Sequence, residues 1–78
     1  MGTTIKQAQR AIDKAGIPLE IVRGEGYHYF IYDVAARNIY ETVSIYVPYT
    51  KQYTAAEWAN QAGLAHCNII DFIKRREG

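Results

Sequence analysis

The hydrophobic residues near the start of the chain recur at helical spacing. Ile5, Ala8 and Ile12 lie three or four positions apart and form one apolar stripe, which predicts an amphipathic helix over about residues 4–15. Gly16 follows this segment, and glycine is the residue type that most often ends a helix in the left-handed conformation. We therefore expect the fold to begin with a helix that packs along one side.

The middle of the chain changes from helical spacing to runs of aromatic and β-branched residues, which favour strands. Three such runs, at residues 19–23, 27–33 and 39–47, each predict a strand. The residues between the first two runs, Gly24 to Gly26, are typical of a tight turn because glycine adopts positive φ values without strain. The strands are therefore expected to pair as an antiparallel sheet.

In the third run, hydrophobic and polar side chains alternate, so the two faces of this strand differ in character. The hydrophobic side is interrupted at Glu41. The opposite side is expected to face water, and it carries Tyr40, Thr42, Ser44 and Tyr46. A sheet that is covered by helices on one face leaves such side chains exposed on the other.

The pattern of the second run leaves the orientation of this strand open. Its alternate residues form two sets that are both hydrophobic enough to be buried: Tyr27, Tyr29 and Ile31, or His28, Phe30 and Tyr32. Either orientation exposes large rings beside the third strand, and exposed aromatic patches mark contact surfaces. The expected partner-binding residues are Tyr29, Tyr32, Tyr40, Thr42, Ser44 and Tyr46.

A capping box marks the start of the last element. Thr54 and Glu57 have the three-residue spacing in which each side chain accepts from the other's backbone N–H, so a helix is expected to begin at Ala55. Gly63 leaves two possibilities open. Either the helix continues to the end of the chain, or it is split and residues 63–68 form a turn.

If residues 63–68 form a turn, the segment 55–74 resembles a helix-turn-helix motif. This resemblance implies a DNA-binding regulator whose second helix enters the major groove. Its nucleic-acid-binding residues would be His66, Asn68, Lys74 and Arg75. Phosphate contacts dominate such binding, and the start of this helix has neither Arg nor Lys, so DNA is the less favoured partner.

These elements predict a single compact domain over residues 1–78 with an α+β fold, in the order helix, strand, strand, strand, helix. The helices are expected to cover one face of a three-stranded antiparallel sheet. A chain of 78 residues with net charge +1 has room for one thin core, and it lacks a strong electrostatic attraction to nucleic acid or membrane. No segment is apolar enough to span a bilayer or to act as a secretion signal, which favours the cytoplasm.

Chemical groups for catalysis are scarce. The single cysteine, Cys67, cannot form an internal disulfide, and its neighbour His66 diverges from it by about 100° on a helix, so the pair cannot act as nucleophile and base. The chain has two histidines, and their spacing does not suit a metal site. We therefore expect no catalytic residue, no metal, no cofactor and no enzymatic activity.

Three blocks of sequence resemble a group of small bacteriophage and prophage proteins. They are LEIVRGEGYHYF at residues 19–30, ETVSIYV at residues 41–47, and Glu57-Trp58, and the similarity covers roughly residues 15–60. The resemblance implies a phage or mobile-element protein that acts inside a bacterial host. Small phage proteins without catalytic residues often block a surface of a host machine, as inhibitors of the anti-CRISPR kind do.

The resemblance and the exposed tyrosines together lead to one functional prediction. We expect a non-enzymatic protein-binding module that inhibits a host defence complex of the CRISPR type by covering part of its surface. Its partner would be a host protein or ribonucleoprotein complex. Homodimerisation through the sheet face is a further alternative, because it would bury the same tyrosines without a foreign partner.

Overall fold

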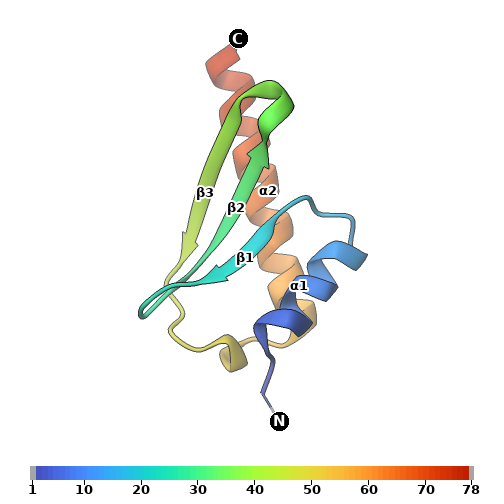
Figure 1. The fold of residues 1–78 in the computed structure, drawn as a ribbon, viewed down its shortest axis with the longest axis vertical. Helices are drawn as coiled ribbons and strands as arrows, with labels where there is room; N and C mark the ends of the chain where they lie inside the picture. Colours follow the sequence, from blue (N-terminus) through green and yellow to red (C-terminus); the bar gives the residue numbers. More distant parts are fainter. Residues whose placement is uncertain (1, 78) are drawn as a thin grey trace.

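The computed structural model describes residues 2–77, and its elements follow the order that the sequence predicts. The helices are α1 (Ile5–Lys14) and α2 (Ala55–Glu77), and the strands are β1 (Glu20–Arg23), β2 (His28–Val34) and β3 (Ile39–Ile45). Two short 3-10 turns, η1 (Ala35–Arg37) and η2 (Thr50–Gln52), precede β3 and α2. Figure 1 shows α2 behind the sheet and α1 against α2 beside β1, which confirms the predicted α+β fold.

Both ends of α1 are capped by hydrogen bonds from residues at its termini. The Thr4 hydroxyl accepts from the Gln7 N–H at 3.2 Å, and the Gln7 side chain accepts from the Thr4 N–H at 3.0 Å. At the other end, Gly16 has a φ of 75°. This left-handed residue reverses the chain so that the N–H of Ile17 donates to the carbonyl of Ile12 at 3.2 Å.

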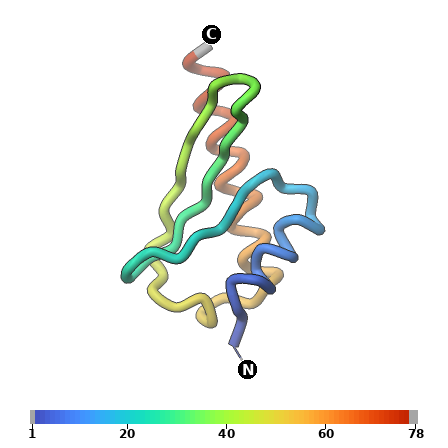
Figure 2. The backbone as a smooth tube through the Cα atoms, in the orientation of Figure 1, coloured from blue at the N-terminus to red at the C-terminus, as the bar shows by residue number. Residues whose placement is uncertain are grey.

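The sheet is antiparallel, with β2 between β1 and β3. At its centre, Phe30 of β2 lies opposite Ile21 of β1 and Val43 of β3, so these side chains share one face. Within the described residues, β1 and β3 are both edge strands. Figure 2 shows that the β2–β3 hairpin runs alongside α2.

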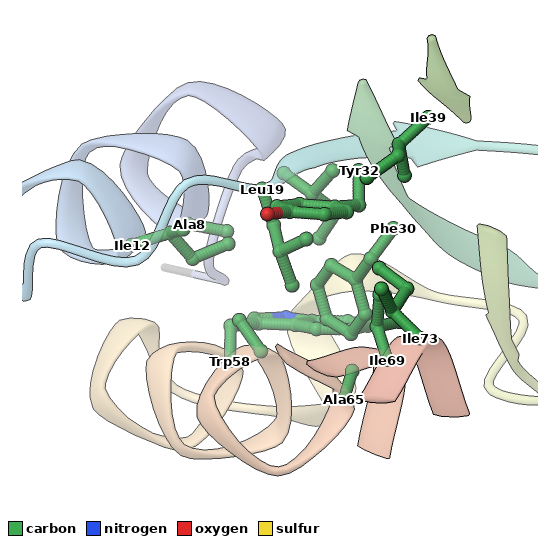
Figure 3. Packing of buried hydrophobic residues seen from close by; sticks show 12 residues of the cluster. Ala8, Ile12, Leu19, Phe30, Tyr32, Ile39, Trp58, Ala65, Ile69 and Ile73 are labelled. Atoms are coloured by element: carbon green, nitrogen blue, oxygen red, sulfur yellow. The ribbon is translucent and has the colours of Figure 1, made fainter. Parts of the chain in front are cut away.

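Trp58 lies at the centre of the core, and its side chain is completely buried. Its indole N–H donates a hydrogen bond of 2.8 Å to the carbonyl oxygen of Thr50, so no donor is left unsatisfied. Phe30 and Tyr53 meet the indole edge-on, with ring centroids 6.2 and 5.0 Å away. Figure 3 shows Phe30 and Trp58 between the sheet and α2. Further buried hydrophobic residues are Ala8, Ile12, Leu19, Ile21, Tyr32, Ile39, Ala62, Ala65, Ile69 and Ile73.

α2 is one continuous helix, so residues 63–68 are helical and do not form a turn. Ala62 and Ala65, on either side of Gly63, are both buried. Their packing offsets the cost of about 1 kcal/mol that a glycine imposes on a helix. The predicted alternative of a helix-turn-helix motif in residues 55–74 is therefore wrong, because the segment contains no turn.

Candidate partner-binding surface

The face of the sheet that points away from α2 is uncovered in Figure 1, and we call it the open face. The strand register assigns its members, because Val22, Tyr29 and Ser44 are direct neighbours across the three strands, on the opposite face from Phe30. The open face consists of Glu20, Val22, Tyr27, Tyr29, Ile31, Asp33, Tyr40, Thr42, Ser44 and Tyr46.

His28 decides which face of β2 is open. Its ring is completely buried, with Nδ1 2.7 Å from the carbonyl oxygen of Val47 and Nε2 2.7 Å from Thr50 Oγ1. Both polar ring atoms are therefore satisfied inside the core, as burial requires. Phe30 and Tyr32 share this face, and Tyr32 is only 7% exposed. Tyr32 therefore lies in the core and not on the partner-binding surface where the sequence placed it.

Three tyrosines, Tyr27, Tyr29 and Tyr46, gather on the open face near the β1–β2 turn, and we call them the tyrosine cluster. The ring centroid of Tyr27 is 5.9 Å from that of Tyr29 and 6.5 Å from that of Tyr46, within the range of aromatic pairs. Tyr27 lies over Gly24, where a Cβ atom would come within 2.8 Å of its ring. Tyr27 is not among the partner-binding residues that the sequence predicts. The sequence signal for its position is Gly24, because a glycine at this point of the turn leaves room for the Tyr27 ring.

The edge strand β3 presents a row of exposed side chains, as its alternating sequence predicts. The row contains Tyr40, Thr42 and Ser44, and Tyr46 directly follows the strand. Tyr46 is 85% exposed and Tyr40 is 61% exposed, whereas Tyr29 on the neighbouring strand is half-buried. The hydroxyl groups of the row donate and accept hydrogen bonds, and the rings supply apolar area. This combination is typical of surfaces that bind proteins.

The charged members of the open face are acidic. They are Glu20, which lies opposite Ile31, and Asp33, which lies opposite Tyr40. Both side chains are exposed. Carboxylates in these positions repel phosphate groups and attract cationic side chains of a partner.

The residues of the nucleic-acid alternative lie on one continuous helix and have different surroundings. His66 is half-buried, and its ring packs against a ring of β2 at a centroid distance of 5.6 Å. Asn68 and Lys74 are exposed, and Arg75 forms an ion pair of 3.2 Å with Asp71. Without a separate recognition helix, these side chains are not directed together toward a DNA groove.

Two further kinds of site are not found in residues 2–77. Among the side chains of residues 2–76, no three from His, Cys, Asp or Glu are grouped so that they could hold a metal ion. Among the same residues, no helix combines the length and the apolar composition that crossing a bilayer requires.

Comparison of the chain with known protein families, with curated proteins and with solved structures finds no match. The open face offers rings, hydroxyl groups and carboxylates. Binding is the activity that such groups support without further chemistry.

Proposed function

We propose that this protein is a non-enzymatic module that binds another protein through the open face. The observation that carries the proposal is the exposure of Tyr40 and Tyr46, at 61% and 85%, on a sheet face that no helix covers. Burial of apolar surface is favourable by about 25 cal/mol per Å². Tyrosine gains this contact area at low entropic cost, because only two side-chain angles have to be fixed.

A protein surface fits the open face better than a small molecule or a nucleic acid does. Small-molecule sites are concave, whereas Tyr46 projects from the sheet with most of its surface exposed. The exposed carboxylates of Glu20 and Asp33 oppose the phosphates of a nucleic acid. The same carboxylates complement Lys or Arg side chains at the rim of a protein partner.

The resemblance to bacteriophage proteins directs the proposal to a bacterial host. We propose that the partner is a host defence complex of the CRISPR type, either one of its proteins or the assembled ribonucleoprotein. The chain would inhibit this complex in the host cytoplasm by covering a functional surface. Inhibition by coverage requires binding and shape complementarity, and it requires no catalytic group on the inhibitor.

Affinity capture with matched tyrosine variants tests this function. The tagged wild-type protein should enrich a defence complex from a lysate of the bacterial host, and a variant with Tyr40→Ala and Tyr46→Ala should lose it. Tyr49→Ala is the control, because Tyr49 is 55% exposed but lies at the η2 turn, outside the open face. Circular dichroism should show that all three proteins are folded, since each substitution removes an exposed ring.

Two outcomes would overturn the proposed function. Retention of the complex by the double variant would show that the open face is not the contact surface. Equal loss of the complex by Tyr49→Ala would place the contact elsewhere on the molecule. With the purified complex, the wild-type protein should inhibit target cleavage, whereas the variant that carries Tyr40→Ala and Tyr46→Ala should not.

A further inference from the structure

The exposed large hydrophobic side chains are concentrated along the outer edge of β3. Among residues 2–76, five such side chains are exposed: Tyr40, Tyr46, Tyr49, Leu64 and Phe72. Tyr40 lies on β3, Tyr46 directly follows it, and Phe72 lines a hollow against it. Leu64 lies two helical turns before Phe72. Tyr40 and Tyr46 are on the open face, and Leu64 and Phe72 are on α2. Concentrated apolar exposure of this kind marks an interface.

A hollow of about 230 Å³ lies between the edge of β3 and α2. Thr42 and Val43 line it from the strand, and Asn68 and Phe72 line it from the helix. Leu64 precedes Asn68 by one helical turn, so Leu64, Asn68 and Phe72 form one row along this side of α2. The row and the strand edge therefore border the same space.

The edge of β3 is open to pairing with another strand. β3 has seven residues, and in the described part of the chain it pairs only with β2. Proteins usually protect such an edge with Lys, Pro, a bulge or an inward-pointing charge. The strand sequence IYETVSI contains neither Lys nor Pro, and its register with β2 runs without interruption. Its one charged residue, Glu41, faces inward, and its carboxylate is paired with Arg76 at 3.3 Å.

We propose that a second copy of this chain occupies the edge, with the two β3 strands antiparallel about a twofold axis through Val43. The axis is perpendicular to the sheet, so the two sheets join into one and both α2 helices remain on the same side. This pairing uses the strand edge, not the sheet face, and leaves the open face uncovered. It is independent of the proposed function, because it needs no host partner.

The register about Val43 gives each exposed ring of the edge a matching ring. Within β3, Thr42 of one copy lies opposite Ser44 of the other, twice by symmetry. Tyr40 of one copy then approaches Tyr46 of the other, which directly follows β3 at a turn where the N–H of Val47 donates to the carbonyl of Ile45. Pairing about the neighbouring Thr42 instead would place Tyr40 opposite Ser44 and Tyr46 opposite the hairpin turn. The register about Val43 is therefore the one that pairs both tyrosines.

Beneath the joined strands, the same axis brings the two α2 rows toward each other. The rows run in opposite directions, so Leu64 of one copy approaches Phe72 of the other, with Asn68 between them. The Asn68 amide has both donor and acceptor atoms, which lets two copies of it pair with each other. Apolar groups of each copy then fill the hollow of the other.

The charges near the edge are compatible with a symmetric pair. Glu41, the inward-facing carboxylate of β3, is 3.3 Å from Arg76, and Asp71 is 3.2 Å from Arg75. In the proposed register the two Glu41 carboxylates are about 13 Å apart along the strands, beyond the screening length of about 8 Å at physiological salt. The pairing therefore brings no uncompensated like charges into contact.

Multi-angle light scattering tests the proposal. At high concentration the wild-type protein should show twice the monomer mass of 8.9 kDa. A variant with Leu64→Glu and Phe72→Glu should stay folded, because both positions are exposed, and should be monomeric because the charges would be buried in the pair. Tyr49→Glu, an exposed position away from this edge, should remain dimeric. A wild-type monomer at every concentration, or a dimer that tolerates both glutamates, would overturn the proposal.

Disulfide crosslinking tests the register. In a Cys67→Ser background, oxidation of Val43→Cys should yield a covalent dimer, because the two Cβ atoms face each other across the axis. Tyr46→Cys is the control, since its two equivalents would be about 20 Å apart along the strands. A dimeric sample in which Val43→Cys does not crosslink, or in which Tyr46→Cys does, would overturn the register.

The two proposals fail separately. The variant with Leu64→Glu and Phe72→Glu retains every residue of the open face. If it is monomeric and still captures the host complex, pairing is lost while partner binding persists. If the wild-type protein is dimeric and captures no partner, the self-pairing stands and the proposed function fails.

Discussion

The imidazole Nε2 of His28 and the hydroxyl oxygen of Thr50 are 2.7 Å apart in the interior of the protein. The other ring nitrogen, Nδ1, is 2.7 Å from the carbonyl oxygen of Val47, which can only accept a hydrogen bond. Nδ1 therefore donates to Val47, and in the neutral ring Nε2 accepts from the Thr50 hydroxyl. These bonds join β2 to the segment before α2 and hold His28 on the inner face of the sheet. Because side chains alternate between the two faces along a strand, Tyr27 and Tyr29 then lie on the open face.

Removal of the His28 ring should destabilise the protein. His28→Leu replaces the ring with an apolar side chain of similar bulk, and it leaves the Thr50 hydroxyl and the Val47 carbonyl without their buried partner. The free energy of unfolding should therefore fall by about 2–4 kcal/mol. Urea denaturation measures this change. His66→Leu is the control, because His66 is only half-buried, and it should cost less than about 1 kcal/mol. Equal losses in both variants would contradict the anchoring role of His28.

Substitution of Gly63 tests the continuity of α2. A Cβ atom there would lie 3.7 Å from Ile17 Cδ1, which is an ordinary contact, so Gly63→Ala should raise the free energy of unfolding by about 0.5–1 kcal/mol. Gly26→Ala is the contrasting variant. Gly26 has a φ of 78°, and alanine should lower stability there by about 1–2 kcal/mol. A destabilising Gly63→Ala would instead indicate a turn at residues 63–68.

The ion pair between Glu41 and Arg76 should make a small contribution to the free energy of unfolding. The two side chains are 25% and 55% exposed, and such pairs contribute about 0.2–1 kcal/mol. A double-mutant cycle with Glu41→Gln and Arg76→Gln, followed by urea denaturation, should give a coupling in this range that weakens in high salt. A coupling that is the same at low and high salt would contradict a solvent-accessible pair.

Local patterns in the sequence predict the order of the elements and most of their boundaries in this fold. The capping box of Thr54 and Glu57 forms as its spacing predicts, and the alternation in β3 separates its exposed and inward-facing residues correctly. Neighbouring residues carry the information for both features. This is why the order of the elements and the exposed row on β3 can be predicted from sequence alone.

The orientation of β2 and the role of Glu41 depend on distant residues. The hydrogen-bond partners of His28 are 19 and 22 residues away, and Arg76 is 35 residues from Glu41. No local pattern encodes these contacts, so the sequence leaves the strand orientation open and includes Tyr32 among the binding residues. Gly63 is ambiguous for a related reason. A glycine permits a turn as well as a helix, and the helix forms here because α2 packs against the rest of the fold.

The central claim is that a protein partner covers the open face, and oxidative footprinting of tyrosines tests it most directly. The variant with Leu64→Glu and Phe72→Glu is used, so that self-pairing does not contribute. In the free protein, Tyr40, Tyr46 and Tyr49 should all be labelled, because all are exposed. With the captured host complex bound, we predict that labelling of Tyr40 and Tyr46 falls and that of Tyr49 is unchanged. Unchanged labelling of Tyr40 and Tyr46 in the bound state would contradict the claim.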